Sequence, residues 1–380
     1  MNKDLNIAVV GTYKTSELYS RNIIAINTIK SICSNAREFR PDYTASLDAT
    51  SSLTSFSRFI IYTYTTLRQW FSLSRQIKAI RSYPIIYVPY PAHLDILLVK
   101  IFTLGKKNII IMDAFLGLHD TAIMDRKLFS KTSIASHLIR LLEKISLSYA
   151  DMIILDTKLQ ADSLIKSYQL PENKVTSLPV GINESQWRPQ HTLDYNENFN
   201  LLFWGTFIPL HGVEIIIESA LKLQASEKNI QFTLVGTGQT AYKIKSEYKD
   251  KWPVNVKWVD KILPMNQLHK MSEEAHCILG IFGTSAKSSK VIPYKVYQAL
   301  SMNKPIITRN SQAYPQQPPQ SLITISPGNA SELTDAILTL IKNYTKYTSS
   351  SDALHYYETH FSNKAYRKSF QIMLQSLNYE

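Results

Sequence analysis

The sequence contains few cysteines for its length. Its 380 residues include two, Cys33 and Cys277, and these lie far apart along the chain. Two distant cysteines provide neither a disulfide framework nor the clustered thiolates of a structural zinc site. We therefore expect a protein of a reducing, cytosolic compartment.

Long apolar runs are also missing. No run approaches the ~20 residues that cross a bilayer, and the first residues, MNKDLNIAVVGTY, turn directly into a short strand-like run. That beginning does not have the layout of a signal peptide. We expect neither secretion by that route nor a membrane-spanning segment.

Acidic residues are outnumbered by basic ones. Lys and Arg together number 42 against 30 Asp and Glu, which gives a formal net charge of +12. Such an excess favours anionic partners, which could be nucleotide phosphates, acidic lipid head groups or nucleic acid. The lysines are scattered and no recognised nucleic-acid module occurs, so specific nucleic-acid binding is not expected.

Short apolar runs alternate with longer helical stretches. The runs predicted to form strands are 6–10, 85–88, 108–112, 152–155, 200–203, 231–235, 256–259, 277–281 and 305–308. They are apolar throughout rather than alternating, as strands covered on both faces require, so we expect parallel sheets flanked by helices. The predicted fold class is α/β.

The length predicts two domains, because a single α/β core usually stops growing at roughly 150 to 250 residues. The segment 177–200 is irregular and polar, and a new strand-turn-helix unit begins at Leu201. We place the boundary there, with an N-terminal domain over 1–185 and a C-terminal domain over 186–361. A helix over 362–380 is expected to pack back on the first domain.

Glycine turns follow two predicted strands in the second half. One strand ends at Gly205 and Thr206, and His211 then stands just before a new helix. Backbone N–H groups at such a helix N-terminus can bind phosphate, although an ordinary βα turn shows the same pattern. Gly236 and Gly238 follow the next strand, and a lone pair of this kind is weaker evidence.

The segment KVIPYKVYQAL, residues 290–300, is the most informative of the second half. Pro293 suits the first turn of a helix, and the free N–H groups of that turn could receive a diphosphate. Lys290 and Lys295 could supply compensating charge. A solvated basic face is the alternative for both lysines.

Several stretches together resemble a known family. They are LLFWGTFIPLHGVEIIIESA, ILGIFGTSAKSSKVIPYKVYQALSMNKPIIT, MDAFLGLHDTAIMDRK, and ADMIILDTKLQADSL followed by VTSLPVGINESQWRP. Their order and spacing resemble a branch of glycosyltransferase family 4, the retaining enzymes of GT-B architecture. The resemblance implies two Rossmann-like parallel-sheet domains facing a cleft, with the nucleotide sugar held mainly by the second and the acceptor by the first.

The resemblance also implies a metal-independent reaction, because the family neutralises the leaving diphosphate with basic side chains and helix N-termini. No DxD pair stands in a metal-like setting, and no metal or other cofactor is expected. The donor-binding residues implied are Gly205 and Thr206 under the diphosphate, Gly236 and Gly238 near the nucleotide, Ile292 and Pro293 at the phosphates, and Gln298 beside the ribose.

The chain departs from the family at four of these positions. An arginine and a lysine are common in the first phosphate turn, where this chain has Thr206 and His211. Two glutamates separated by seven residues are also characteristic, and Lys290 and Gln298 stand in their places. A catalytically degenerate GT-B-like binding subunit is therefore the alternative to an active transferase.

Polar residues at strand ends of the first domain are the candidate catalytic groups. Asp113, His119 and Asp120 lie at and just after the end of the strand predicted over 108–112, where open α/β sheets bind ligands. Such groups could hydrogen-bond the sugar or stabilise an oxocarbenium-like transition state, while the departing diphosphate deprotonates the acceptor. For His119 the alternative is an ordinary loop hydrogen bond.

Four further residues are predicted to line the acceptor site. Tyr13, Arg21 and Asn22 follow the first strand, and His93 follows another. Arg21 could face a donor phosphate or an acidic acceptor. A capping or surface role is the alternative.

The segment 56–81, FSRFIIYTYTTLRQWFSLSRQIKAIR, combines apolar and aromatic residues with five basic residues and no acid. A helix of this kind can lie on an anionic membrane at roughly 1 kcal/mol per basic group, although packing on its own sheet is the commoner fate. We predict a glycosyltransferase that moves a sugar from a nucleotide-sugar donor to a glycan or lipid-linked acceptor, in surface polysaccharide or lipopolysaccharide assembly. Its predicted location is the cytoplasm, peripheral at the inner face of the membrane.

Overall fold

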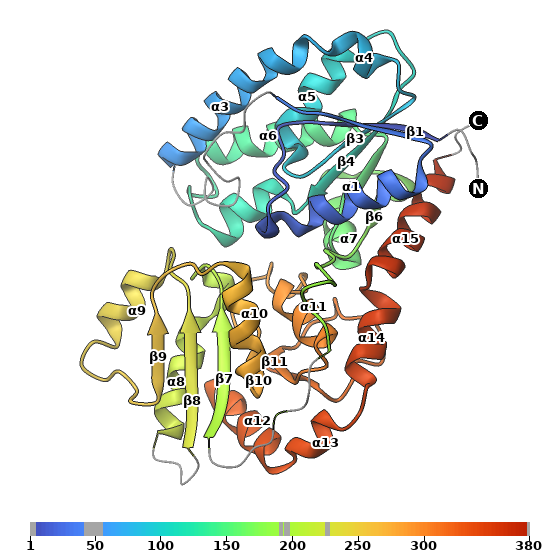
Figure 1. The fold of residues 1–380 in the computed structure, drawn as a ribbon. Helices are drawn as coiled ribbons and strands as arrows, with labels where there is room; N and C mark the ends of the chain where they lie inside the picture. Colours follow the sequence, from blue (N-terminus) through green and yellow to red (C-terminus); the bar gives the residue numbers. More distant parts are fainter. Residues whose placement is uncertain (1–4, 42–55, 190–192, 194–197, 225–228, 378–380) are drawn as a thin grey trace. The chain divides into compact units, whose positions relative to one another are not determined.

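The computed structural model describes residues 5–41, 56–189, 193, 198–224 and 229–377, and the chain forms two compact units (Figure 1). Unit 1 comprises Met1–Gly181 and Tyr366–Glu380, and unit 2 comprises Ile182–Ala365. The chain passes from unit 1 to unit 2 after Gly181, four residues before the boundary predicted after residue 185. It re-enters unit 1 at Tyr366, four residues after the predicted start of the C-terminal helix at 362.

Unit 1 contains a six-stranded parallel sheet in the order β2-β1-β3-β4-β5-β6. Its strands are β1 (Asn6–Val10), β2 (Asn35–Phe39), β3 (Ile85–Val88), β4 (Ile109–Phe115), β5 (Met152–Leu155) and β6 (Val175–Ser177). The strands predicted over 6–10, 85–88, 108–112 and 152–155 are present. β4 extends to Phe115, so Asp113 lies inside the strand and not after its end, which corrects the prediction.

Two strands of this sheet were not predicted, and both lie at its edges. β2 has the largely polar sequence NAREF and pairs only with β1. β6 is three residues long and pairs only with β5. Because an edge strand is less fully covered, neither carries the continuous apolar run that identifies a central parallel strand.

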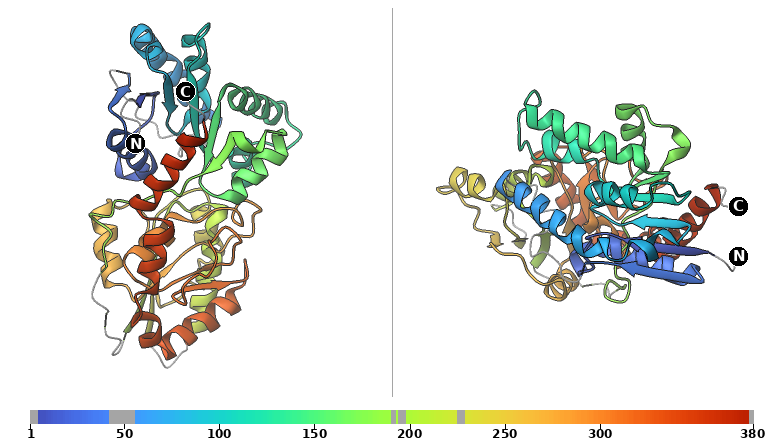
Figure 2. Two further views of the ribbon diagram at one scale, coloured as in Figure 1. Left: turned by 90° about the vertical axis from the view of Figure 1, so that its right-hand side faces the viewer. Right: turned by 90° about the horizontal axis from the view of Figure 1, so that it is seen from above.

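Helices cover both faces of this sheet. Along β1, Ile7 and Val9 join one apolar cluster, whereas Ala8 and Val10 join the other, as alternation along a strand requires. The first cluster contains residues of α1 (Ser20–Ile32) and α15 (Asn363–Ser376), and Figure 2 shows α15 (red) lying against unit 1. The second cluster lies under a layer of helices: α3 (Phe56–Ser74), α4 (Ile77–Arg81), α5 (Ala92–Phe102), α6 (Ile134–Tyr149) and α7 (Lys158–Tyr168).

Unit 2 has a second six-stranded parallel sheet, in the order β12-β11-β10-β7-β8-β9. Its strands are β7 (Asn198–Trp204), β8 (Asn229–Val235), β9 (Val256–Val259), β10 (Cys277–Leu279), β11 (Ile306–Arg309) and β12 (Leu322–Ile325). Its helices include α8 (Val213–Leu223), α9 (Ala241–Glu247), α10 (Met265–Glu274), α11 (Tyr294–Ser301), α12 (Ala330–Lys342), α13 (Tyr344–Thr348) and α14 (Asp352–His360). Only the edge strand β12 was not predicted.

Local sequence explains where several helices begin. Ser133 accepts a hydrogen bond from the N–H of Ser136 before α6, and Thr157 accepts one from Gln160 before α7. The two parallel sheets between helices confirm the predicted pair of Rossmann-like domains of GT-B type. Among the described residues, no helix is both long and apolar enough to cross a membrane.

Candidate active site

A buried ion pair joins α1 to the central strand β4 of unit 1. The Arg21 Nε atom lies 2.8 and 2.9 Å from the two carboxylate oxygens of Asp113, and the Tyr87 hydroxyl donates to the same carboxylate at 2.7 Å. Arg21 also donates to the carbonyl oxygens of Leu178 at 3.0 Å and Leu155 at 3.2 Å. One guanidinium thus ties three neighbouring strand ends together.

The burial of this pair bears on two predicted roles. Asp113 is fully buried and Arg21 nearly so, and the hydrogen-bond partners described above for both groups belong to unit 1. Burial, with the Asp113 carboxylate beside it, raises the pKa of Tyr87 well above its ordinary value. These contacts indicate a structural ion pair, rather than the sugar contact predicted for Asp113 or the contact with a donor phosphate or an acidic acceptor predicted for Arg21.

Glu143 organises the loop that follows β4. Its carboxylate accepts hydrogen bonds from the N–H groups of Leu118 at 2.6 Å and His119 at 2.9 Å, and from the Tyr168 hydroxyl at 2.6 Å. Burial alone would raise the pKa of Glu143, but the nearby His93 ring and the hydrogen bonds from Tyr168 and the His119 N–H outweigh it and lower the pKa. Glu143 was not predicted as a site residue, because a single acid within a helix is usually solvated.

The two other candidate catalytic residues lie in this loop. The His119 ring is partly exposed, and its Nε2 atom lies 3.2 Å from the Ser136 hydroxyl. Burial lowers the pKa of His119, so a neutral imidazole is favoured near neutral pH. Asp120 is partly exposed and begins a short π-helical turn, Asp120–Asp125. Both side chains therefore retain access to solvent, unlike Asp113.

The remaining residues predicted for the first domain hold the framework. Asn22 donates to the carbonyl oxygens of Lys14 at 3.0 Å and Tyr90 at 2.7 Å. The Tyr13 hydroxyl donates to Glu38 at 2.7 Å, and its ring is fully buried. His93 is also buried, with Nε2 3.6 Å from Glu143. These three residues are buried and stabilise the loops at the strand ends, rather than line an open surface.

Asp95 is a buried carboxylate held by neutral donors. It accepts from the Thr12 N–H at 2.6 Å and from the Trp70 indole at 2.9 Å. Burial raises its pKa to about 6, because these hydrogen bonds compensate only part of the lost hydration. Asp95 thereby connects α3, α5 and the turn after β1.

The two glycine turns predicted in unit 2 lie against each other. The Gly205 N–H donates to Val235 at 3.0 Å, and the Gly236 N–H donates to Val259 at 3.0 Å. Gly236 has φ +135°, and a Cβ there would overlap the carbonyl oxygen of Gly205. Only glycine permits this approach of the two turns.

Gly238 has a similar close neighbour. A Cβ on it would lie 2.8 Å from backbone atoms of Phe207, whose N–H donates to Thr237 at 3.0 Å. Thr206 is exposed beside this contact. The predicted diphosphate turn and nucleotide turn thus form one continuous backbone surface at adjacent strand ends.

His211 packs over the first turn. Its ring would lie 2.6 Å from a Cβ on Gly205 and is 5.5 Å, edge to face, from the Phe203 ring. The next residue, Gly212, has the left-handed φ of +60° and stands just before α8, and a Cβ on it would lie 2.6 Å from the Gly283 nitrogen. The loop after β10 therefore lies directly against this helix start.

Buried cations surround these loops. Lys295 donates to the carbonyl oxygen of Trp204 at 2.9 Å, and its ammonium lies 4.0 Å from the Phe203 ring centroid. Burial lowers the pKa of Lys295 to about 7. Arg309, at the end of β11, donates to the carbonyl oxygen of Gly283 at 2.8 Å. Arg309 was not among the predicted site residues, although it follows a predicted strand directly.

The other predicted donor-binding residues lie around α11. Pro293 stands just before the helix, Lys290 is partly exposed, and Ile292 is buried. Gln298 is fully buried, its amide nitrogen lies 3.8 Å from the Met265 sulfur, and its amide oxygen has no hydrogen-bond partner among the described residues. The structure therefore places Gln298 inside the unit rather than on an open surface.

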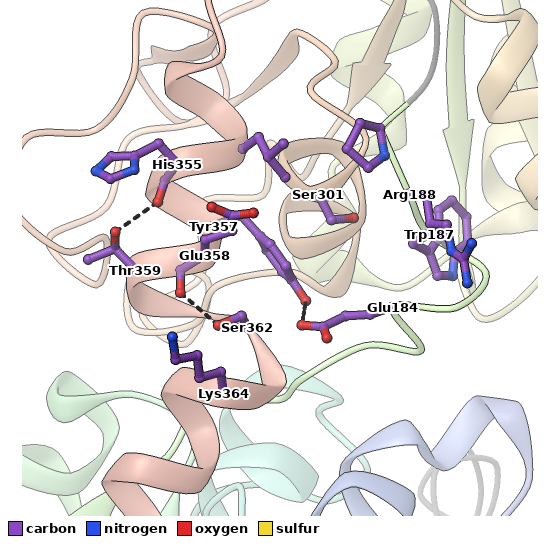
Figure 3. Close-up of a pocket in the computed structure, with 12 residues that line it drawn as sticks. Glu184, Trp187, Arg188, Ser301, His355, Tyr357, Glu358, Thr359, Ser362 and Lys364 are labelled. Atoms are coloured by element: carbon purple, nitrogen blue, oxygen red, sulfur yellow. Dashed lines mark hydrogen bonds between the residues drawn. The ribbon is translucent and has the colours of Figure 1, made fainter.

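A cavity of about 540 Å³ opens elsewhere in unit 2, between the segment after Ile182 and α14 (Figure 3). Here the Tyr357 hydroxyl and the Asn363 N–H both donate to one oxygen of Glu184, at 3.0 and 2.7 Å. None of its lining residues belongs to the predicted site. The cavity lies where the segment after Ile182 packs against α14 and the residues that follow it. Its size alone therefore does not make it the active site.

In the part of the chain that the structure describes, no group of three or more His, Cys, Asp or Glu side chains could hold a metal ion. The polar groups at the strand ends of unit 2 are backbone amides, lysines and an arginine, which suit an anion.

Comparisons with known proteins give one match of sequence and several of fold. Residues 198–343 match the family model of glycosyl transferases group 1. No curated protein sequence matches the chain. The matched residues include both glycine turns, Lys295 and Arg309.

Solved structures match nearly the whole chain. HepE from Anabaena in complex with UDP-glucose is 14% identical with a TM-score of 0.67, covering 98% of this chain and 100% of that chain. Sucrose-phosphate synthase from Thermosynechococcus elongatus is 13% identical with a TM-score of 0.69, covering 98% and 99%. The apo form of the lipopolysaccharide outer core galactosyltransferase WaaB is 15% identical with a TM-score of 0.60, covering 98% and 99%. At these identities the likeness shows the fold alone.

Proposed function

We propose that this protein is a glycosyltransferase that moves a sugar from a nucleotide-sugar donor to a hydroxyl group of an acceptor. Unit 2 holds the donor in this proposal. The match of residues 198–343 to group 1 glycosyl transferases supports it, as does the fold shared with the UDP-glucose complex of HepE.

The observation that carries the proposal is the set of buried cations around the glycine turns. Lys295 and Arg309 are both buried, and in the described residues their hydrogen bonds go to carbonyl and hydroxyl oxygens. Buried cations that lack a carboxylate partner create a positive potential where low dielectric strengthens attraction. A diphosphate bound on the adjacent amides supplies the missing negative charge.

The proposed reaction is metal-independent and retains the anomeric configuration. The bond between the anomeric carbon and the diphosphate oxygen breaks, and the acceptor oxygen bonds to the same face of that carbon. The departing diphosphate takes the acceptor proton, while Lys295, Arg309 and the N-terminal amides of α11 stabilise its charge. His119 and Asp120 are the partly exposed polar groups proposed to hydrogen-bond the acceptor.

The proposed acceptor is a glycan or a lipid-linked saccharide at the cytoplasmic face of a membrane, in surface polysaccharide or lipopolysaccharide assembly. The fold shared with WaaB, a lipopolysaccharide galactosyltransferase, supports this class. The exposed apolar side chains of α3 support proximity to lipid: Ile60, Ile61, Tyr64, Leu67 and Phe71.

The competing function is a binding subunit without transfer activity. Gln298 favours it, because a fully buried amide offers the ribose less than an exposed carboxylate does. Thr206 likewise supplies no charge to the first phosphate turn.

Donor binding is the first test. We expect one of the UDP-, GDP-, ADP- or dTDP-sugars to raise the midpoint of thermal unfolding, because ligand at 100 times its Kd stabilises by about 2.7 kcal/mol. Lys295→Met should abolish the shift. Lys304→Met is the matched control, since Lys304 is also buried but donates to the carbonyl oxygens of Glu273 and Ala275 at the end of α10. No shift with any nucleotide sugar would favour the binding subunit.

A further inference from the structure

Helix α6 presents an apolar stripe to solvent. Ile134 is 81% exposed, Leu138 60%, Leu141 52% and Ile145 37%. Their spacing of i, i+4, i+7 and i+11 places all four on one side of the helix. This surface was not predicted from the sequence.

The stripe is not the margin of the core. Helix α6 buries Ile139 and Leu147 together with Ser136, Glu143 and Ser146, and these three polar residues hydrogen-bond within unit 1. The four aliphatic residues of the stripe lie on the other side of the helix. A helix at the surface of a globular protein normally shows polar residues on the side opposite its buried side. Helix α6 instead has a second apolar side, which the described residues leave exposed.

A second stripe lies in the same layer of helices. On α3, Ile61, Tyr64, Leu67 and Phe71 are each about half exposed or more. Helix α5 contacts both α3 and α6, and all three lie over the same face of the sheet (Figures 1 and 2). Two helices of this layer therefore carry an exposed apolar ridge each.

The charges around the α6 ridge have one sign. Lys127, Lys131, Arg140 and Lys144 flank it, and the single acid between residues 126 and 150 is Glu143, which is buried. On α3, on α4 and between them the exposed charges include Arg68, Arg75 and Lys78, with no acid over 56–81. In this layer Asp95 is the acid of α5, and it is buried too.

We propose that α6, together with α3, is a docking surface for a membrane that contains anionic phospholipid. The aliphatic ridges enter the boundary between head groups and acyl chains, and the flanking cations contact lipid phosphates. The inference rests on the proposed membrane-associated acceptor and extends it to a second helix. It does not rest on the donor chemistry.

Charge argues against two other occupants. A second copy docked through the same face of α6 would bring Arg140 and Lys144 close to their own counterparts, without acids to compensate. Nucleic acid would satisfy the cations but would leave Ile134 and Leu138 facing a phosphate backbone. A bilayer matches both features at once.

The test is sedimentation of the full-length protein with phosphatidylcholine vesicles, with or without phosphatidylglycerol. We expect binding that requires phosphatidylglycerol and that Leu138→Gln/Leu141→Gln weakens by at least about tenfold, because each buried CH₂ contributes to partitioning. Glutamine preserves helix propensity, so the variant should remain folded by circular dichroism. Arg140→Gln/Lys144→Gln should weaken binding by about tenfold as well.

Matched controls use exposed residues outside this surface. Val254→Gln/Ile372→Gln removes equally exposed aliphatic side chains, and Lys243→Gln/Lys249→Gln removes two exposed cations from unit 2. Both should bind vesicles like the wild type. The nucleotide-sugar-induced thermal shift should persist in every variant, so loss of lipid binding is separable from loss of donor binding.

Four results would overturn the inference. If Leu138→Gln/Leu141→Gln binds like the wild type while Leu67→Gln/Phe71→Gln does not, α3 alone contacts lipid. If the wild type binds neither vesicle, membrane docking fails for both helices. If the wild type self-associates in sedimentation velocity and the α6 variant is monomeric, the ridge is an interface between copies. If the apolar variants have no effect but high salt abolishes binding, the partner recognises charge alone.

Discussion

In unit 1 the buried cation Arg21 meets a carboxylate, Asp113, whereas in unit 2 the buried cations Lys295 and Arg309 meet backbone carbonyl oxygens. Both sets lie where parallel strands end, and both units have six-stranded sheets between helices. In unit 1 the Asp113 carboxylate neutralises the charge of Arg21. Unit 2 leaves positive charge uncompensated at its glycine turns.

This difference assigns different tasks to two similar frameworks. A neutralised ion pair fixes strand ends and gains little from an incoming anion, because its attraction is already satisfied. Uncompensated cations in a low dielectric gain most from a phosphate group. The comparison therefore favours unit 2 as the donor-binding unit, on grounds independent of family resemblance.

Removing one partner of the unit 1 pair should have the largest effect. Arg21→Met leaves the Asp113 carboxylate buried with the Tyr87 hydroxyl and no cation, so we expect a loss of about 3–5 kcal/mol in the free energy of unfolding. Urea denaturation measures it. Arg367→Met is the control, since Arg367 is exposed and donates to a carbonyl oxygen of unit 1, and it should change stability by less than about 0.5 kcal/mol.

The double variant Arg21→Met/Asp113→Leu sharpens the same point. It should be less destabilised than the sum of the single variants, because no charge is left unpaired. Additive losses would mean that the two residues do not act as a pair. If Asp113→Asn instead abolished transfer while leaving stability unchanged, Asp113 would be catalytic and the comparison would fail.

Substitution in the glycine turns of unit 2 should have the next largest effect. Gly236→Ala places a Cβ on the Gly205 carbonyl at a φ of +135°, so the two turns must separate. We expect a loss of about 2–4 kcal/mol in thermal or urea unfolding. Gly105→Ala is the control: its φ is +73° but nothing lies within 4 Å of a Cβ, so backbone strain alone should cost about 1 kcal/mol. Equal losses would mean that the close approach of the turns is unimportant.

These variants also show what the sequence could reveal. The glycine turns were predictable because each follows a buried apolar run and turn chemistry is local. The pair of Arg21 and Asp113 was not, since 92 residues separate them and neither residue type signals burial. The central strands were predictable because burial on both faces produces a continuous apolar run. The edge strand β2 is less fully buried, carries no such run and was not predicted.

The solvent exposure of the candidate residues could not be predicted from the sequence either. His119, Asp120 and Asp113 looked alike at one strand end, yet the first two are partly exposed and Asp113 is buried. The distinction depends on how far β4 continues, and on a guanidinium supplied by α1. Both are tertiary facts, so a local pattern could propose a region but not rank its members.

The smallest expected effect concerns the pH dependence of unit 2. The folded-state pKa of Lys295, about 7, lies below its ordinary value of 10.5. Between pH 7 and pH 10.5 this lysine is more protonated in the unfolded chain than in the folded protein, so it makes the free energy of unfolding rise with pH. The destabilisation caused by burying Lys295 is therefore fully present below pH 7. Lys295→Met should therefore stabilise the protein by about 1–2 kcal/mol near neutral pH, with a smaller gain as pH approaches 10.

Urea unfolding of the variant and the wild type across this pH range measures the difference, with Lys304→Met as the companion. Burial lowers the pKa of Lys304 only to about 8, so its gain should be smaller and its carbonyl hydrogen bonds to α10 more costly to lose. A donor diphosphate beside Lys295 should raise the pKa of that lysine and so take up a proton, which titration calorimetry in buffers of different ionisation enthalpy detects. Donor binding without proton uptake near pH 8 would mean that the diphosphate does not lie beside Lys295. The buried cations of unit 2 would then have to bind a different anion.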